Sequence, residues 1–186
     1  NANPFVEVTF LNTEVQSNLI GLYNANNINA AIAIGKYFGV ADEDIKQALE
    51  GYVPENNRSQ LICRKTNEII LDAYNANPSS IAVAITNFIQ LKRNGKIMVL
   101  GDMFELGKDS ISEHKNVVES LLDQDDIMCF FVGKDFYSNK TQRENFHFYE
   151  SFDSFSEEFK RYHFQNKIIL IKGSRGMALE RTLELI

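Results

Sequence analysis

The stretch Lys96-Ile-Met-Val-Leu-Gly-Asp102, followed by an amphipathic helical run at Ser110–Leu122, decides the predicted fold. Its apolar residues are continuous rather than alternating, which is typical of a strand covered on both faces. The same strand-then-helix unit recurs on either side of it. Further apolar runs lie at Glu68–Leu71, Ile127–Val132, Phe146–Tyr149 and Lys167–Ile171, and further helical runs at Pro78–Arg93, Ser154–Tyr162 and Gly176–Leu185. This alternation predicts an α/β domain with a doubly wound, mostly parallel sheet.

Three helix starts carry local signals. Asn77 followed by Pro78 is typical of an N-cap with proline in the first helical position. Ser110 with Glu113, and Ser154 with Glu157, each have the spacing of a capping box. We therefore expect helices to begin at these three places.

The first 50 residues have a different pattern. Phe5–Leu11 predicts one strand or hairpin arm, and Asn12–Asn18 reads as a polar patch after it. Two helices are expected next, at Asn27–Phe38, with Gly39 placed to end the helix, and at Asp42–Leu49. The turn-rich segment at 51–57 predicts a domain boundary, which separates residues 1–53 from residues 54–186.

Composition excludes several classes of protein. The chain has 186 residues and a net charge of −6, which argues against a protein built to hold nucleic acid. No apolar run approaches the length of a membrane span, so no membrane partner is expected. Cys63 and Cys129 lie in apolar runs without a CxxC motif, and we expect both to be buried thiols. Three scattered histidines and two cysteines do not match a zinc site, so no metal site is expected.

Polar residues gather just after the predicted strands, where ligands bind in open α/β sheets. Four loops follow this rule: Asp72–Ser80, Gly101–Gly107, Gly133-Lys134 and Lys172–Gly176. The last brings backbone N–H groups, a hydroxyl and two cations to one turn, which favours an anion, and Asp72 is placed to accept from ribose hydroxyls. Each loop alone is also explained as an Asx-turn or a helix cap.

Other chemistries find no support in the sequence. There is no GxxxxGK[ST] phosphate loop and no GxGxxG dinucleotide motif after the first strand. No nucleophile with a supporting base is evident, so no catalytic residue is expected in this chain. The sequence predicts an anion site without the residues that would perform chemistry on the ligand.

Three segments of the chain resemble the Mur ligase family. They are Leu71-Asp-Ala-Tyr-Asn-Ala-Asn-Pro-Ser79, Val99-Leu-Gly-Asp-Met-Phe-Glu-Leu-Gly107 and Lys172-Gly-Ser-Arg-Gly-Met177, with Gly21-Leu-Tyr-Asn-Ala-Asn-Asn27 upstream. The resemblance implies that residues 1–53 are the end of a central ATPase domain and residues 54–186 a Rossmann-like C-terminal domain. It also implies a fragment: the P-loop and the Mg²⁺ ligands would lie in a missing part, and the chain would be inactive alone.

The resemblance further implies a cytoplasmic, ATP-dependent amide ligase of peptidoglycan precursor synthesis. Such an enzyme phosphorylates the terminal carboxylate of UDP-N-acetylmuramoyl-tripeptide with ATP and Mg²⁺, and D-alanyl-D-alanine attacks the acyl phosphate. Two alternatives remain: the C-terminal domain of a sister ligase, such as a folylpolyglutamate-type enzyme, and a non-catalytic nucleotide-binding or receiver-like module.

Carried over residue by residue, the family motifs imply two groups of binding residues. The nucleotide-binding group is Asn24, Asn27, Arg58, Asp72, Tyr74 and Asn75, and the substrate-binding group is Asn77, Lys172, Ser174 and Arg175. Asn77 is alternatively only a helix cap. Two positions depart from the family pattern: Tyr23 stands where a histidine is usual, and Asn57 stands where a glycine usually precedes the arginine. For Asp102 and Glu105, loop-structuring hydrogen bonds compete with substrate contact, and His114 is expected to be a packing or surface residue rather than a base.

Overall fold

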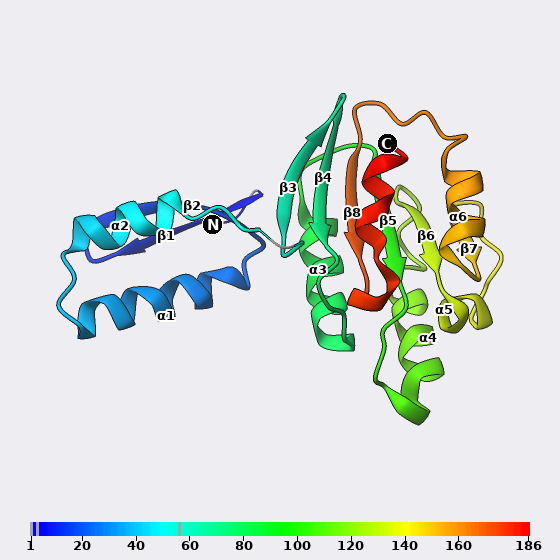
Figure 1. Cartoon of the computed structure of the whole chain (residues 1–186), viewed down its shortest axis with the longest axis horizontal. Coiled ribbons are helices and arrows are strands. Elements are labelled where there is room, and N and C mark those ends of the chain that lie inside the picture. Colours follow the sequence, from blue (N-terminus) through cyan, green and yellow to red (C-terminus); the bar gives the residue numbers. More distant parts are fainter. Residues whose placement is uncertain (1, 3, 56) are drawn as a thin grey trace. The chain divides into compact units, whose positions relative to one another are not determined.

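The computed structural model describes residues 2, 4–55 and 57–186 (Figure 1). The chain forms two compact units: residues up to Glu55 group with Val83–Lys92, and the rest of the chain forms the second unit. The domain boundary between residues 53 and 54 stays a prediction, and residue 56 of the turn-rich segment lies outside the described residues.

The first unit is a hairpin with two helices. Strands β1 (Phe5–Phe10) and β2 (Thr13–Ile20) pair antiparallel, and helices α1 (Asn24–Tyr37) and α2 (Asp42–Gly51) follow. Both helices match the prediction, and Gly39 has a φ of +73°, as its place after α1 requires. The small core of this unit consists of Val6, Ile28, Ile32 and Ile45.

The polar patch expected at Asn12–Asn18 is wrong, because most of it is strand β2. Its residues alternate, with Val15 and Ser17 buried and Glu14 and Gln16 exposed. The inward Ser17 hydroxyl donates to the carbonyl of Val6 at 2.8 Å. A buried serine whose hydroxyl is hydrogen-bonded can occupy a core position. Because Ser17 is polar, the alternation of inward and outward residues could not be recognised from the sequence.

The second unit is built on a six-stranded sheet of order β3-β4-β8-β5-β6-β7. Its strands are β3 (Gln60–Arg64), β4 (Asn67–Asp72), β5 (Lys96–Gly101), β6 (Met128–Val132), β7 (Phe146–Tyr149) and β8 (Ile168–Lys172). All neighbours are parallel except β3, which runs antiparallel to β4 at the edge. The predicted mostly parallel α/β fold is confirmed, whereas β3 was missed.

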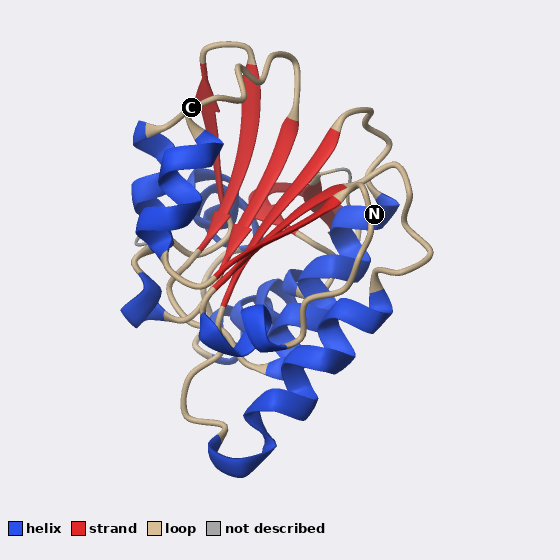
Figure 2. Ribbon diagram, turned by 90° about the vertical axis from the view of Figure 1, so that its right-hand side faces the viewer, coloured by secondary structure: helices blue, strands red, loops and turns tan. Residues whose placement is uncertain are grey.

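Helices cover both faces of this sheet (Figure 2). They are α4 (Ser110–Ser120), α5 (Lys134–Ser138) and α6 (Phe152–Phe159). Helix α3 (Pro78–Gln90) begins in this unit, and its residues from Val83 onward belong to the first unit. Phe130 of β6 contacts Phe155 and Phe159 of α6, whereas its neighbour Phe131 contacts Phe136 of α5. Because adjacent strand residues point to opposite faces, α5 and α6 lie on opposite sides of the sheet, as in a doubly wound fold.

Several local predictions are wrong. The N-cap of α4 is Asp109, without a side-chain cap, and the Ser110 hydroxyl donates to Asp135 at 2.6 Å instead. The box of α6 runs from Ser151 to Ser154, so Ser154 is the inner partner rather than the cap. Asn77 does cap α3, because its Oδ1 accepts the N–H of Ser80 at 2.8 Å.

Two further corrections concern the C-terminus and the cysteines. The helix expected at Gly176–Leu185 is two 3-10 turns, Arg175–Met177 and Leu179–Glu184, separated by Ala178 in the left-handed region at φ +48°. Cys129 is buried, and burial raises the pKa of its thiol to about 12. Cys63 is exposed, because it lies near the end of the edge strand β3.

Among the described residues, no helix has both the length and the apolar character needed to cross a membrane.

Candidate functional site

The loops after β4, β8 and β5 meet at one edge of the sheet. Asp72 and Lys172, the last residues of β4 and β8, are register partners, and Leu100 of β5 pairs with Lys172 on the other side. The chain leaves β4 and β5 toward α3 and α4, whereas β8 leads into the C-terminal 3-10 turns. Open α/β sheets hold ligands outside the carboxyl ends of their strands, where these three loops lie.

We call this edge, where the loops after β4, β8 and β5 meet, the rim. A buried ion pair lies at its centre. Lys172 Nζ lies 2.6 Å from Asp72 Oδ2 and donates to the Asn75 carbonyl at 3.3 Å. The Lys172 side chain is 3% exposed and that of Asp72 18%. The lysine charge is therefore withdrawn from solvent and neutralised within the protein, while the Asp72 side chain keeps some exposure to solvent.

The segment before β3 is held against the same carboxylate. The backbone N–H of Ser59 donates to Asp72 Oδ1 at 3.2 Å. This places Arg58 with its guanidinium over the ring of Tyr74, 3.7 Å from the ring centroid. Both residues that flank Arg58 are left-handed, Asn57 at φ +59° and Ser59 at φ +48°. Non-glycine residues in this region cost free energy and gather at functional sites, so the presentation of Arg58 marks the rim as a candidate site.

The hydroxyl of Ser174 ties three loops together. It accepts the N–H of Phe104 at 2.8 Å and donates to the carbonyl of Ala76 at 3.5 Å. The backbone N–H of Ser174 also donates to the Asp102 carbonyl at 3.2 Å. Ser174 is buried, so in this arrangement it braces the loops after β4, β5 and β8.

Arg175 follows Ser174 and is the accessible cation of the loop after β8. Its side chain is 61% exposed, and Glu180 lies 3.9 Å from its Nη1. A guanidinium so placed can bind a carboxylate or phosphate through two parallel N–H donors. The structure thus separates two cations that the sequence grouped together, since Lys172 is buried and Arg175 faces solvent.

The loop after β5 is fixed by Asp102. Its two carboxylate oxygens accept the N–H groups of Asp135 at 3.1 Å and Phe136 at 3.0 Å, at the start of α5. Burial raises the pKa of Asp102 above the usual carboxyl value, and this effect outweighs the opposing influence of these N–H groups. Loop structuring is therefore the observed role of Asp102.

His114 is fully buried and fixes the same loop. Its Nε2 lies 2.9 Å from the N–H of Met103, and its Nδ1 lies 2.7 Å from the Ser110 carbonyl. These partners assign the neutral tautomer with the proton on Nδ1. The expectation that His114 is a packing residue rather than a base agrees with this environment.

Asn24 and Asn27 lie at the start of α1 in the first unit. Asn24 is buried and donates to the Ile20 carbonyl at 2.8 Å, and its Oδ1 accepts from Asn27 Nδ2 at 2.8 Å. Asn27 is exposed. The pair is therefore ordered by its own hydrogen bonds, with Asn27 presented to solvent.

The described residues contain no group of three His, Cys, Asp or Glu side chains arranged to hold a metal ion. Ser59 and Asp135 were missed as rim residues, because their partners, Asp72 and Ser110, are 13 and 25 positions away. No local sequence signal marks such pairs.

Comparisons with known proteins place the chain in a family. Residues 57–175 match the family described as "Mur ligase, glutamate ligase domain". A UDP-N-acetylmuramoyl-tripeptide–D-alanyl-D-alanine ligase of Bacillus subtilis is 34% identical over 178 residues, which cover 89% of this chain and 38% of that relative. The chain thus spans less than two fifths of the length of this curated relative.

Solved structures agree. The structure of a UDP-N-acetylmuramoylalanyl-D-glutamyl-2,6-diaminopimelate–D-alanyl-D-alanyl ligase from Acinetobacter baumannii matches with a TM-score of 0.79 at 30% identity, over 92% of this chain and 38% of that one. MurF ligase from Thermotoga maritima, in complex with ADP, has the same fold, with a TM-score of 0.79 at 21% identity, over 97% of this chain and 42% of that one. With the parallel sheet and its rim of motif residues, these matches show that the chain belongs to the Mur ligase family and carries that family's C-terminal, glutamate ligase domain.

Proposed function

We propose that this chain is part of a cytoplasmic, ATP-dependent ligase that adds D-alanyl-D-alanine to UDP-N-acetylmuramoyl-tripeptide in peptidoglycan precursor synthesis. The relatives that carry this name support the proposal, because they align over most of the chain. The observation that carries it is the Asp72–Lys172 pair, which gathers the YNANP and KGSRGM segments on one rim.

Nucleotide binding is assigned to the side of the rim near Asp72. Its carboxylate has acceptor capacity beyond its bonds to Ser59 and Lys172, and we assign this capacity to ribose hydroxyls. Arg58, stacked on Tyr74, would reach the phosphates, and the Asn75 carbonyl holds Lys172 beneath them. Asn24 and Asn27 would pair with the edge of adenine. Mg²⁺, bound outside this chain, would neutralise phosphate charge.

Dipeptide binding is assigned to Arg175, whose exposed guanidinium suits the terminal carboxylate of D-alanyl-D-alanine. Lys172 and Ser174 would hold the loop that presents Arg175, and Asn77 would fix the neighbouring helix start. In the reaction, ATP converts the tripeptide carboxylate to an acyl phosphate, and the amino group of the dipeptide displaces phosphate. The residues of this chain orient the amine and exclude water from the acyl phosphate, rather than transferring protons.

A crossed pair of variants in a ligase that carries this chain with an ATPase domain tests the assignment. Arg175→Ala should raise the KM for D-alanyl-D-alanine at least about ten-fold, with little change in the KM for ATP, because a charged hydrogen-bond donor is lost at the dipeptide. Arg58→Ala should raise the KM for ATP, with little change in the KM for D-alanyl-D-alanine. Steady-state phosphate release, with each substrate varied in turn, measures both constants. If both variants raised the KM of the same substrate, the assignment of Arg58 to the nucleotide and of Arg175 to the dipeptide would be wrong.

The 186-residue chain by itself is expected to form no amide bond, because no phosphate loop is present in its sequence. Incubation with ATP, Mg²⁺, the UDP-linked tripeptide and D-alanyl-D-alanine, followed by mass spectrometry, should yield no pentapeptide. Detection of ATP-dependent product would contradict this part of the proposal.

A sister ligase that uses another amino acid is the second candidate, because the Mur ligase fold is shared by enzymes of different specificity. The full-length enzyme would then use an amino acid in place of the dipeptide. A substrate panel of D-alanyl-D-alanine, D-glutamate and L-glutamate distinguishes the two.

A further inference from the structure

The ring of Phe104 is an exposed apolar surface that the rim holds beside Arg175. Phe104 lies in the loop after β5 and is 45% exposed. Its backbone N–H donates to the buried hydroxyl of Ser174, 2.8 Å away. The next residue after Ser174 is Arg175, whose guanidinium faces solvent. The loop after β8 therefore fixes the backbone of Phe104 next to the accessible cation of that loop.

Gly176 indicates that the position of this ring is built into the rim. A Cβ on Gly176 would lie 2.6 Å from Cε2 of Phe104 and 3.2 Å from its Cδ2, so the ring packs directly on the glycine backbone. Gly176 lies in the 3-10 turn Arg175–Met177 and is not among the glycines with a positive φ. Because this backbone conformation is open to any residue, the feature that requires glycine here is the close approach of the Phe104 ring.

A guanidinium with an aromatic ring beside it suits a small carboxylate that carries an alkyl group. The guanidinium binds the carboxylate through two parallel N–H donors, and the ring packs against carbon. Sites for small molecules combine an apolar wall with a few placed polar groups in this way. Because Gly176 directly follows Arg175, the ring that packs on Gly176 lies one residue from the cation.

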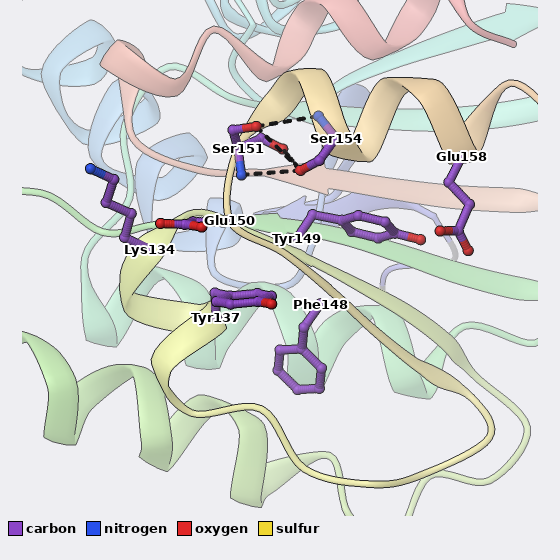
Figure 3. Close-up of a pocket in the computed structure, with 8 residues that line it drawn as sticks. All are labelled: Lys134, Tyr137, Phe148, Tyr149, Glu150, Ser151, Ser154 and Glu158. Atoms are coloured by element: carbon purple, nitrogen blue, oxygen red, sulfur yellow. Dashed lines mark hydrogen bonds between the residues drawn. The ribbon is translucent and has the colours of Figure 1, made fainter.

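The pocket beside β7 is less suited to such a ligand. The carboxylates of Glu150 and Glu158 line it together with Lys134 (Figure 3). Two negative charges against one positive charge disfavour an anion. The start of α6 does not offer the N–H of Ser154, because this group donates to the Ser151 hydroxyl at 3.2 Å. We therefore place the carboxylate ligand at Arg175, three strands away along the sheet.

We propose that Phe104 is a specificity-determining residue of the ligase, whose ring receives the methyl side chain of the terminal D-alanine while Arg175 binds its carboxylate. This inference rests on the proposed function, because it deepens the dipeptide site assigned to Arg175. The methyl group and the carboxylate of a terminal alanine are attached to the same carbon, so neighbouring residues of the rim can contact both. Gly176 is a positioning residue, because it lets the ring lie against the loop.

The test compares two dipeptides in a ligase that carries this chain with an ATPase domain. D-Alanylglycine differs from D-alanyl-D-alanine only by the terminal methyl group, and the unchanged chain should prefer the latter in kcat/KM. Phe104→Ala should lower this preference about four-fold, the contribution expected for burying one methyl group. Phe104→Leu keeps an apolar wall and should retain most of the preference. Ile111→Ala, which removes an apolar side chain that is 48% exposed outside this loop, should leave it unchanged.

Gly176→Ala is a second variant that keeps the ring in the chain. Its Cβ would displace the Phe104 ring, so the preference should again fall, while the KM for ATP stays the same. A ring that only covered the loop would change stability and leave the preference intact.

The outcomes separate this inference from the proposed function. Equal use of the two dipeptides by the unchanged chain, or an undiminished preference in Phe104→Ala, would overturn the role of Phe104 and leave the ligase assignment standing. If Phe104→Ala does not fold, the preference of Gly176→Ala decides in the same way. Use of neither dipeptide by the unchanged chain would instead contradict the proposed function, and the role of Phe104 with it.

Discussion

Asp72→Asn should lower the free energy of unfolding of the second unit by about 3–5 kcal/mol, the range for leaving one member of a buried ion pair without its partner. The variant keeps the shape of the side chain but removes its charge. Lys172, with a side chain only 3% exposed, would then hold its ammonium in the protein against a neutral amide. Urea unfolding followed by circular dichroism measures the change.

A double-mutant cycle separates the ion pair from other effects. Lys172→Met should destabilise as well, and the double variant Asp72→Asn/Lys172→Met should lose much less than the sum, because it leaves neither charge buried alone. Glu119→Gln is the matched control: its pair with Lys115 is exposed, and its loss should cost at most about 0.5 kcal/mol. An Asp72→Asn effect as small as that of Glu119→Gln would show that the pair does not anchor the rim.

This result bears on how the nucleotide assignment is tested. A variant of Asp72 would change both stability and nucleotide use, so a raised ATP requirement would not by itself show ribose contact. Arg58 is the better probe, because its guanidinium lies over the exposed ring of Tyr74 and takes no part in the buried ion pair.

Gly133→Ala should be the second most damaging single change, with a loss of about 4 kcal/mol. Gly133 has φ +129° and ψ 164°, a region that is essentially reserved for glycine. A Cβ at this position would lie within the contact distance of the Asp102 carboxylate, 2.5 Å from Oδ1. The carboxylate would have to move, and the N–H groups of Asp135 and Phe136 would lose their acceptor.

Gly107→Ala is the matched control, because Gly107 also has a positive φ, +56°, but a Cβ there meets no atom within 4 Å. It should cost only the conformational penalty, about 1 kcal/mol. The difference between the two variants, measured by urea unfolding, isolates the contact with Asp102. Equal losses would show that backbone conformation alone explains Gly133, and that the clamp on α5 contributes nothing.

The parallel strands were readable from the sequence because each is buried on both faces. A strand such as Lys96–Gly101 is fully buried, and this leaves a continuous apolar run. The strands that were missed or misread are covered differently. β2 alternates with a buried serine, and β3 is an edge strand whose final residues, Cys63 and Arg64, are exposed. A strand that is not buried on both faces lacks a continuous apolar run, so it is harder to recognise beside a turn.

Capping signals were less reliable because they depend on the competition between partners. Ser110 has a glutamate at the right spacing, yet its hydroxyl donates to Asp135, 25 residues away. Asn77 caps α3 as predicted: its Oδ1 accepts the Ser80 N–H as well as the hydroxyl of the neighbouring Ser79. The sequence shows which side chains can cap a helix, and the fold decides which of them do.

The sequence alone was enough to identify an α/β protein with polar loops after its strands, because continuous apolar runs and the YNANP and KGSRGM segments can be recognised within a few residues. Only the tertiary structure decided how the rim residues are used. Asp72 and Lys172 are 100 positions apart, and the parallel register of β4 and β8 makes them partners. That pairing buries Lys172 and leaves Arg175 as the accessible cation of the loop after β8. The sequence encodes the charge of a side chain, whereas its neighbours in space set its exposure.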